Sequence, residues 1–529
     1  GLSNLTIINN AMRIIRKVYG TEIDLSRLPL DDAKTYELFQ RGDTTGVFQL
    51  ESAGMKRYLR ELKPSVFDDI IAMVALYRPG PMQFIDSFIK RKHGEEKITY
   101  LHDGMKSSLE STYGILVYQE QFMQISKEWC GFTGGQADTL RKAVGKKQID
   151  LMRKVKVDFV KGAVEVGGAT QQQAETFWAQ LEEFANYCFN KSHAACYGLI
   201  AYWTAYLKAH YPDAFMAALM TSDAGDIDRL AIEITESKHM GVSVLLPDVN
   251  ESFVEFAVVP GKQQVRFGMA AVKGVGVAAV EEIIRARELD GKFKSVEDFA
   301  KRVSTSKVNK KAWEALIKAG GFDTLGDRSD LLFNLENILS FASKLQKEAL
   351  SGQTDLFGAL VASGGDELMP SIELKNAPAK YTDKEQLMWE RELMGLYISA
   401  HPLDNFDAFF EEQTIPLHSI GKNIDGQKVT VGGIVTTIRS IVTKSGSKMA
   451  FVGIEDKTSE CEIIVFPKLY EQLGDTLKTD VVLKIIGTVN ARDRDGNMVD
   501  EAKLIADEIS IVTDRELSQY ESHGRKMAA

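Results

Sequence analysis

The spacing of hydrophobic residues follows a helical period through the first half of the chain. Up to about residue 247, apolar side chains recur every three to four positions, as in amphipathic helices. The run Phe67–Leu76 predicts one helix, which should end at Arg78-Pro79-Gly80-Pro81 because proline lacks a backbone N–H and restricts the preceding residue. Residues 170–187 predict another helix, and the apolar, aromatic run 195–220 predicts a buried helix pair.

After about residue 427, apolar and polar residues alternate, which predicts β-strands. A helix-like segment, 467–473, lies between the third and fourth strand-like runs. Five short strands with a helix at that place are the layout of an OB barrel, whose strand face and loops bind single strands. Other small β-barrels would give the same strand count. The strands are expected over residues 429–438, 449–454, 461–466, 481–489 and 504–512.

The region between these two parts is mixed. Residues 241–325 predict short strands followed by compact helices, whereas residues 340–380 are rich in Gly, Ser and Ala and predict a linker. At 529 residues the chain is too long for one hydrophobic core, and about three to five domains are expected. The pattern therefore predicts a multidomain α+β protein that is mainly helical at first and ends in a β-barrel.

The composition is that of an ordinary water-soluble globular protein, with 44% hydrophobic and 26% charged residues. No apolar run approaches the roughly 18 residues that span a bilayer, and no signal peptide opens the chain. The cysteines are scattered without a Cys-x-x-Cys pair, which indicates neither a disulfide framework nor a zinc site. We expect a reducing, cytoplasmic compartment and no membrane partner. The four cysteines are Cys130, Cys188, Cys196 and Cys461.

Two basic patches contrast with the formal net charge of -10. The first, residues 139–147, has four cations in nine residues and no carboxylate, and the second is Phe189-Asn190-Lys191-Ser192-His193. Clustered Arg and Lys beside a His suit a ligand with several phosphate charges, such as a triphosphate or a nucleic-acid backbone. Taken alone, each patch fits a solvated helix face better. The cations of the first patch are Arg141, Lys142, Lys146 and Lys147.

Residues 271–280 contain two glycines, one residue apart, at the start of an amphipathic helix. Gly274 and Gly276 predict a turn whose backbone N–H groups grip a phosphate without reading a base, and Lys273 adds positive charge. A second helical unit at 309–319 is a suitable partner, so the region predicts a helix-hairpin-helix that binds duplex DNA. A plain helix-start turn is the alternative, because Gly-x-Gly alone is weak evidence.

The predicted linker contains the short motif Gln353-Thr354-Asp355-Leu356-Phe357. Two adjacent bulky apolar side chains in a polar loop can insert into a pocket of a partner protein. The alternative is that Leu356 and Phe357 fasten the loop to the chain's own domain.

In this order, the features resemble the bacterial DNA polymerase III alpha subunit, the C family of replicative DNA polymerases. The resemblance covers nearly the whole chain. Near the OB region it runs through a connector, Leu393-Met394-Gly395-Leu396-Tyr397 with Ser399-Ala400-His401-Pro402-Leu403. In the first half it runs through Thr45-Gly46-Val47-Phe48-Gln49-Leu50-Glu51-Ser52, Arg78-Pro79-Gly80-Pro81, Tyr113-Gly114-Ile115, Tyr118-Gln119-Glu120-Gln121, Gly145-Lys146-Lys147 and Phe189-Asn190-Lys191-Ser192-His193.

The resemblance implies an order of domains with a mainly α-helical fingers domain. The expected ranges are the end of the palm at 1–40, the fingers at 41–240, a helix-hairpin-helix and clamp-binding domain at 241–345, a linker with the clamp motif at 346–380, a helical connector at 381–425, the OB-fold domain at 426–513 and a tail at 514–529.

The resemblance also implies roles for the residues singled out above. Cations and a His donor near the incoming dNTP would stabilise charge that develops on the pyrophosphate. The family often has two arginines where this chain has Arg141 and Lys142, and lysine lacks the bidentate fork, so Arg141 should matter more. The expected nucleotide-binding residues are Arg141, Lys142, Asn190, Ser192 and His193, and the expected DNA-binding residues are Lys146, Lys147, Lys273, Gly274 and Gly276.

The implied protein partners include the ring-shaped sliding clamp (beta) and other replisome subunits. Gln353, Asp355, Leu356 and Phe357 would dock on the clamp. Primer–template DNA would lie on the fingers and hairpin, and single-stranded template on the OB domain.

Catalysis in this family depends on three palm Asp residues that hold two Mg2+ ions, and these are expected upstream of Gly1, as is the PHP domain. Asp226 with Asp228, and Asp493 with Asp495, lie in loop-like contexts and do not replace them. The two-metal route needs those carboxylates. We therefore expect DNA-directed DNA polymerase (nucleotidyltransferase) activity from the full subunit and none from this chain alone.

Two other classes fit the sequence less well. A non-enzymatic helix-hairpin-helix and OB protein of repair or recombination is the alternative, but it does not explain the Arg-Pro-Gly-Pro and Tyr-Gly-Ile blocks. An unrelated NTPase is disfavoured because the chain contains no Gly-x-x-x-x-Gly-Lys-Ser/Thr loop.

Overall fold

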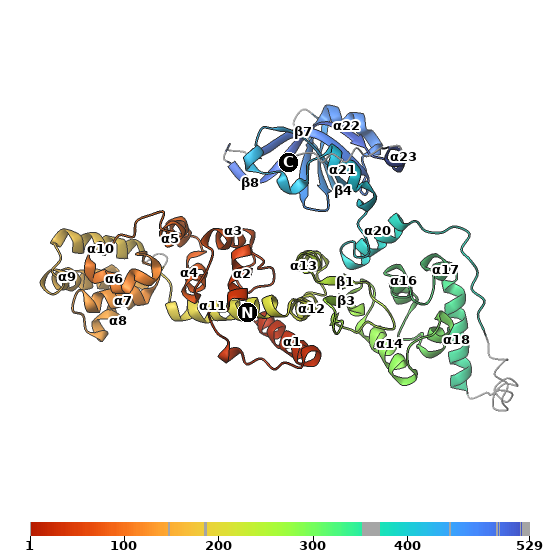
Figure 1. Cartoon of the computed structure of the whole chain (residues 1–529), viewed down its shortest axis with the longest axis horizontal. Helices are drawn as coiled ribbons and strands as arrows, with labels where there is room; N and C mark the ends of the chain where they lie inside the picture. The colour runs from red at the N-terminus through yellow and green to blue at the C-terminus, as the bar shows by residue number, and fades with distance from the viewer. Residues whose placement is uncertain are drawn as a thin grey trace. The chain divides into compact units, whose positions relative to one another are not determined.

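The computed structural model describes residues 2–145, 149–184, 188–351, 371–443, 446–492, 496, 498–518 and 520. By its internal contacts the chain divides into two compact units. The first comprises Gly1–Pro378 with Leu393–Gly395, and the second comprises Ala379–Glu392 with Leu396–Ala529 (Figure 1).

The first half of the chain is helical, as its hydrophobic period predicts. Helix α4 (Phe67–Leu76) has the predicted bounds and ends at Tyr77, just before the Arg78 to Pro81 turn. The predicted buried pair is α11 (Lys191–His210) and α12 (Pro212–Ser222), which part at Tyr211 because Pro212 cannot continue a helix. The other helices of this half are α1 (Leu2–Tyr19), α2 (Ala33–Arg41), α3 (Ala53–Leu62), α5 (Ile85–Lys92), α6 (Lys106–Leu109), α7 (Gln119–Glu128), α8 (Gly134–Gly145), α9 (Ile149–Glu165), α10 (Gln171–Phe184) and α13 (Ile227–His239).

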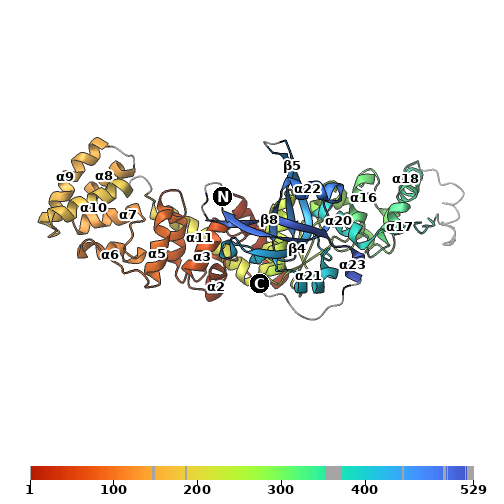
Figure 2. The same cartoon turned by 90° about the horizontal axis from the view of Figure 1, so that it is seen from above.

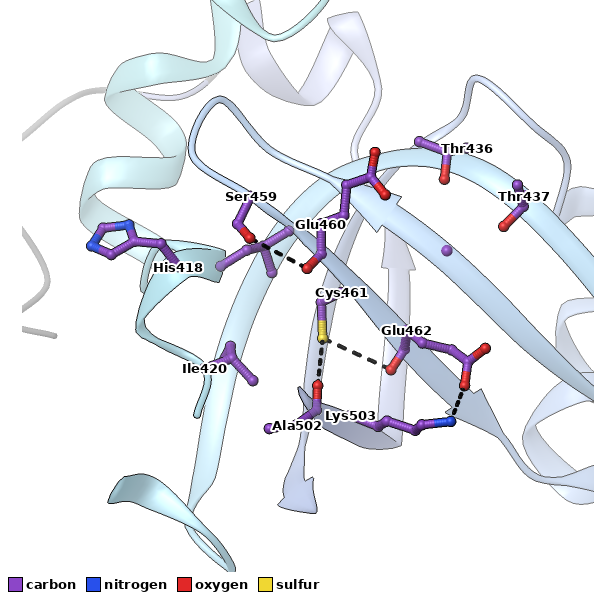
Figure 3. A pocket seen from close by; sticks show the side chains of 12 residues that line it. His418, Ile420, Thr436, Thr437, Ser459, Glu460, Cys461, Glu462, Ala502 and Lys503 are labelled. Atoms are coloured by element: carbon purple, nitrogen blue, oxygen red, sulfur yellow. Dashed lines mark hydrogen bonds and ion pairs between the residues drawn. The ribbon is translucent and has the colours of Figure 1, made fainter. Parts of the chain in front are cut away.

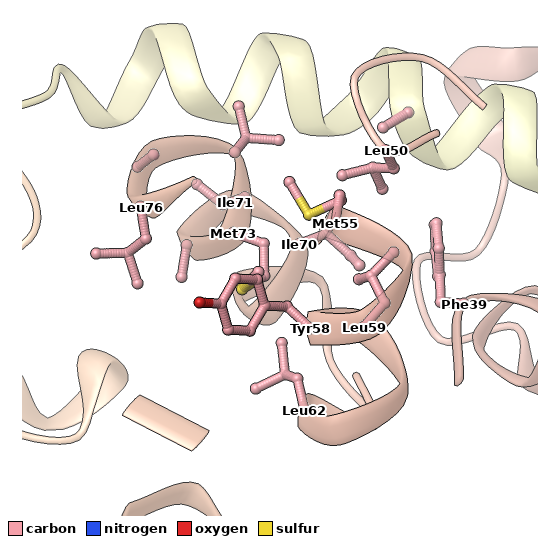
Figure 4. Packing of buried hydrophobic residues seen from close by; sticks show 14 of the residues in the cluster. Phe39, Leu50, Met55, Tyr58, Leu59, Leu62, Ile70, Ile71, Met73 and Leu76 are labelled. Atoms are coloured by element: carbon pink, nitrogen blue, oxygen red, sulfur yellow. The ribbon is translucent and has the colours of Figure 1, made fainter. Parts of the chain in front are cut away.

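Hydrophobic cores join many of these helices, and two of the described cores contain the helices that carry the basic patches. In the first, side chains of α2, α3 and α4 pack beneath α11, with Leu59, Ile70 and Met73 fully buried (Figure 4). In the second, α7 to α10 surround an aromatic cluster in which the Phe159 and Phe177 rings stack with centroids 6.0 Å apart. Both views show α7 to α10 as one group (Figure 2). These cores fix where α8 and α11 begin and end, and therefore where the basic patches lie.

The middle of the chain has the predicted mixture of short strands and helices. Strands β1 (Ser243–Leu245), β2 (Ala257–Val258) and β3 (Gln264–Arg266) form a sheet in the order β1-β3-β2, with β1 parallel to β3. Helices α14 (Val277–Asp290), α15 (Val296–Arg302), α16 (Lys310–Lys318) and α17 (Arg328–Phe333) follow.

The linker prediction is wrong over its first part. Helix α18 (Leu335–Ser351) runs through residues 340–351. The Gln346 side chain accepts a hydrogen bond from Thr305 N (3.0 Å) and donates one to Val303 O (2.8 Å), while Ala342 is fully buried. Small residues hid the helical period, and contacts with distant residues stabilise the helix. Residues 371–380 form neither helix nor strand.

The second unit contains the predicted barrel. All five predicted strands are present as β4 (Lys428–Val442), β5 (Lys448–Glu455), β6 (Glu460–Val465), β7 (Val482–Arg492) and β8 (Met498–Ile511), with α22 (Pro467–Leu473) between β6 and β7. They close in the order β4-β5-β6-β8-β7, where β6 and β8 are parallel. Alternate residues such as Val452, Ile463 and Ile485 fill the interior. Helices α20 (Asp383–Met394) and α21 (Asp407–Gln413) precede the barrel, and α23 (Asp514–Ser518) follows it.

Candidate nucleotide and nucleic-acid interface

The second basic patch forms the N-terminus of α11, which is fastened to the start of α7. Asn190 is the N-cap residue, and its Oδ1 accepts a hydrogen bond from His193 N (2.8 Å). Asn190 Nδ2 donates to Glu120 Oε1 (2.8 Å), and Lys191 N donates to Glu120 Oε2 (2.8 Å). Glu120 therefore satisfies a backbone donor at the positive end of the helix. The patch has a fixed acidic partner 70 residues away in the sequence.

The polar side chains at the start of α11 are exposed and pack against aromatic rings. Ser192 and His193 are exposed. The His193 ring lies 4.4 Å from the Tyr197 ring and 5.4 Å from the Phe189 ring, between centroids. The Arg78 guanidinium covers the Phe189 ring at 4.0 Å, and burial lowers the pKa of Arg78. Hydroxyl, imidazole and cation groups in this arrangement can donate hydrogen bonds to an anionic ligand.

The first basic patch lies on α8, where a neighbouring acid engages its cations. Arg141 donates two hydrogen bonds to Asp138 Oδ1 (3.0 and 2.8 Å), and Lys142 Nζ lies 2.8 Å from Asp138 Oδ2. These bonds from Lys142 and Arg141 lower the pKa of the Asp138 carboxyl. Asp138 lies one residue before the first basic patch, residues 139–147, so the charge pattern of the patch did not include it. An anion at this patch would compete with Asp138 for both cations.

Both patches lie against the start of α7. Gln119 N donates to Phe189 O (2.8 Å), and its Nε2 donates to Cys188 Sγ (3.3 Å). A Cβ added at Gly145, the last residue of α8, would lie 3.6 Å from Gln119 Nε2. The end of α8 and the segment just before α11 therefore both lie beside Gln119. Lys146 and Lys147 lie outside the described residues.

The predicted glycine hairpin is present before α14. Gly274 has a φ of +94°, which only glycine adopts readily, whereas Gly276 has a φ of −87° and is the N-cap residue of α14. A Cβ at Gly276 would meet nothing within 4 Å, so open space faces the first turn of the helix. Lys273 is exposed, and its backbone N donates to Leu393 O (3.0 Å). Open space at the N-terminus of a helix is where a phosphate can approach the backbone N–H groups of the first turn.

The second helix of the motif packs behind the hairpin and brings a further cation. Asn309 caps α16 by accepting from Ala312 N (3.0 Å), and Trp313 stacks on Phe322 with centroids 5.1 Å apart. A Cβ at Gly274 would lie 3.2 Å from Lys311 Cε. Lys311 is exposed, and the sequence reading missed it. Only the packing of α16 against the hairpin reveals that it lies beside Gly274.

A hollow of about 590 Å³ opens at the surface of the barrel and reaches core residues such as Cys461 (Figure 3). It lies beside β4, β5, β6 and β8, and its lining includes Gly453, Glu460, Glu462 and Lys503. Lys503 Nζ lies 2.6 Å from Glu462 Oε1. The hollow is on the strand face that binds single strands in OB folds.

Some predicted features have no position in the structure. Gln353, Asp355, Leu356 and Phe357 lie outside the described residues, so the clamp motif stays a prediction. Among the described residues, no three His, Cys, Asp or Glu side chains are placed to hold a metal ion. The described helices include none that is both long enough and apolar enough to cross a membrane.

Three families match the chain along its length. Residues 4–167 match the bacterial DNA polymerase III alpha subunit finger domain, residues 241–331 the helix-hairpin-helix motif, and residues 429–512 the OB-fold nucleic acid binding domain. Together with the geometry above, these matches define a multidomain nucleic-acid-binding protein with polymerase fingers.

Several similar proteins are bacterial DNA polymerase III alpha subunits. DNA polymerase III subunit alpha of Thermus aquaticus is 42% identical over 498 residues, which cover 92% of this chain and 40% of that protein. DNA polymerase III subunit alpha of Aquifex aeolicus is 41% identical over 490 residues, which cover 92% of this chain and 40% of that protein. Asparaginyl-tRNA synthetase from Pyrococcus horikoshii matches at 16% identity and a TM-score of 0.16, over 19% of this chain and 23% of that chain. The chain matches bacterial DNA polymerase III alpha subunits over 92% of its length and spans about 40% of the length of these relatives.

Proposed function

We propose that this chain supplies the nucleotide-binding and DNA-binding surfaces of a bacterial replicative DNA polymerase. The observation that carries the proposal is the glycine hairpin. Open space faces the first turn of α14 at Gly276, with Lys273 exposed and Lys311 beside Gly274. A backbone turn flanked by cations grips phosphates without reading bases, which suits an enzyme that copies any sequence.

Titration of labelled primer–template DNA at increasing salt tests the proposal. Binding should weaken steeply with salt, because each neutralised phosphate contributes a slope of about −0.9 in log K against log salt. Lys273→Ala and Lys311→Ala should each weaken binding equally on different sequences and reduce that slope. Lys310→Ala is the matched control, because Lys310 is already paired with Glu336. Salt-independent binding would refute the proposal.

The incoming dNTP would bind where α8 and α11 meet α7. The support is that α8, which carries Arg141 and Lys142, ends beside Gln119 at the start of α7. Gln119 N also donates to Phe189 O just before α11, which carries Ser192 and His193 and is capped by Asn190. Two Mg2+ ions would supply charge stabilisation when bound by palm carboxylates, which the family resemblance places outside this chain. We therefore expect no primer extension by this chain alone, and extension in Mg2+ would contradict this.

The Gln353 to Phe357 motif would dock on the sliding clamp, with other replisome subunits as further partners. Burying Leu356 and Phe357 offers roughly 3–6 kcal/mol before ordering costs, enough for a micromolar-range tether. The double variant Leu356→Ala with Phe357→Ala should abolish binding to surface-bound clamp. Thr354→Ala is the matched control, because Thr354 is a spacer. Equal affinities for wild type and double variant would refute clamp docking.

A further inference from the structure

A short segment of the connector packs beside the glycine hairpin. Leu393, Met394 and Gly395, here called the connector tripeptide, belong to the first compact unit, although they lie far from the hairpin in the sequence. Leu393 is buried, and Met394 is fully buried. The burial of two large apolar side chains stabilises the position of the tripeptide within this unit.

The connector tripeptide is bonded to the backbone that enters the hairpin. Lys273 N donates a hydrogen bond to Leu393 O at 3.0 Å. Gly274 follows with its φ of +94°, and Val275 N donates to Val272 O at 3.0 Å, which closes the turn. The Leu393 carbonyl therefore fixes the peptide plane just before the turn, while the Lys273 side chain stays exposed to a ligand.

The other end of the connector tripeptide lies against the start of α13. Gly395 has a φ of +95°, a conformation that favours glycine. A Cβ at Gly395 would lie 2.7 Å from Ile227 Cγ2 and 2.8 Å from Ile227 O. Both distances are too short for a carbon atom, so only glycine allows the two backbones to approach this closely. Ile227 is the first residue of α13.

Ion pairs tie α13 to other parts of the same unit. Near the start of the helix, Arg229 is paired with Glu51, which lies in the loop before α3. Near its end, Glu236 is paired with the buried Lys208 of α11. The connector tripeptide therefore joins the hairpin to a helix whose own position is fixed at both ends.

We propose that the connector tripeptide positions the hairpin for duplex binding, and that Gly395 is the positioning residue on which its contact with α13 depends. The inference rests on the proposed function, in which the hairpin holds the DNA backbone. A turn that is already held in its binding conformation loses less conformational entropy when a phosphate binds. The tripeptide acts through the backbone of Lys273 and does not itself contact DNA.

Fluorescence anisotropy of a short labelled DNA duplex, titrated with the full chain and with Gly395→Ala, tests the inference. The added methyl group would force the tripeptide away from Ile227 and loosen its bond to Lys273. Duplex affinity should fall by about 3- to 10-fold, the change that corresponds to the loss of one net hydrogen bond. Amide hydrogen exchange in residues 272–276 should become faster in the same variant.

Gly241→Ala is the matched control for backbone strain. Gly241 has a similar φ of +78°, but a Cβ at this position would meet nothing within 4 Å. The substitution therefore introduces comparable strain without displacing a neighbour. Duplex affinity and exchange in residues 272–276 should stay close to those of the wild type.

A double-mutant cycle with Lys273→Ala separates positioning of the hairpin from general destabilisation. Lys273→Ala removes the charge but keeps the backbone N–H that donates to Leu393 O. Because the tripeptide positions this cation, the loss of duplex affinity caused by Lys273→Ala should be smaller in the Gly395→Ala background than in the wild type. A change that only destabilises the fold would give additive losses.

Wild-type duplex affinity in a folded Gly395→Ala chain would overturn the inference, as would an equal loss in Gly241→Ala or additive losses in the cycle. If Gly395→Ala does not fold, Met394→Ala takes its place, and an unchanged affinity in that variant overturns the inference. In each of these cases the hairpin can still hold DNA. If Lys273→Ala and Lys311→Ala both leave duplex binding unchanged, the proposed function of the hairpin fails together with the inference.

Discussion

Replacing Asn190 should loosen the start of α11 and weaken anion binding there. Asn190→Ala removes the N-cap bond to His193 N and one of the two bonds that Glu120 accepts at this end of the helix. Loss of an N-cap costs about 0.5–2 kcal/mol, and a net hydrogen bond about 0.5–1.5 kcal/mol. Together these give about 1–3 kcal/mol of local stability. Asn190→Ser keeps a capping oxygen and should lose only the Glu120 bond.

Hydrogen exchange followed by mass spectrometry measures this loss. A change of about 1–3 kcal/mol corresponds to about 5- to 150-fold faster exchange in the first turn of α11. Exchange in Asn190→Ser should lie between the variant and wild type. Binding of inorganic triphosphate should weaken in the same order, because Ser192 and His193 would no longer be held. Wild-type exchange rates in Asn190→Ala would refute the capping role of the residue.

Three further predictions concern buried and paired charges. Burial and the nearby Asp223 carboxyl raise the pKa of Glu233 to about 9. Between about pH 4.5 and 9 the folded chain therefore binds one more proton than the unfolded chain. The free energy of unfolding of the wild type should therefore fall as the pH rises through that window, and it should fall less in Glu233→Gln. The same dependence of melting temperature on pH in both proteins would contradict this. Lys208 is fully buried, donates to Asp43 O and Thr45 O, and pairs with Glu236. Lys208→Met should therefore lower the free energy of unfolding by about 3–5 kcal/mol in chemical denaturation. A loss below about 1 kcal/mol would contradict this. Asp138→Asn should release Arg141 and Lys142 and raise the affinity for inorganic triphosphate in calorimetry, and an unchanged affinity would remove these cations from the anion site.

The sequence predicted the elements whose cause is local. Helix α4 has the predicted bounds because proline breaks the chain just after it, and the barrel strands follow the alternation of apolar residues. The glycine hairpin was predictable for the same reason, since Gly274 and the start of α14 are neighbours in the chain.

The missed features depend on contacts between distant residues or on helix geometry. Glu120 reaches Asn190 only after α7 and α11 pack together, and Lys311 reaches Gly274 only after α16 packs behind the hairpin. Asp138 engages Arg141 and Lys142 because residues three and four apart share a helix face, which a count of charges in a window does not reveal. The long-range bonds of Gln346 likewise extend α18 into a stretch that lacks a clear period.

The most direct test of the account is primer–template binding by Gly276→Ala, measured beside its melting temperature. A Cβ at Gly276 meets nothing within 4 Å and the backbone there suits any residue, so the melting temperature should stay close to that of wild type. The added methyl group would occupy the space through which a phosphate approaches the first turn of α14. The account predicts markedly weaker duplex binding with unchanged melting. Wild-type affinity in a folded Gly276→Ala chain would contradict the claim that this hairpin holds DNA.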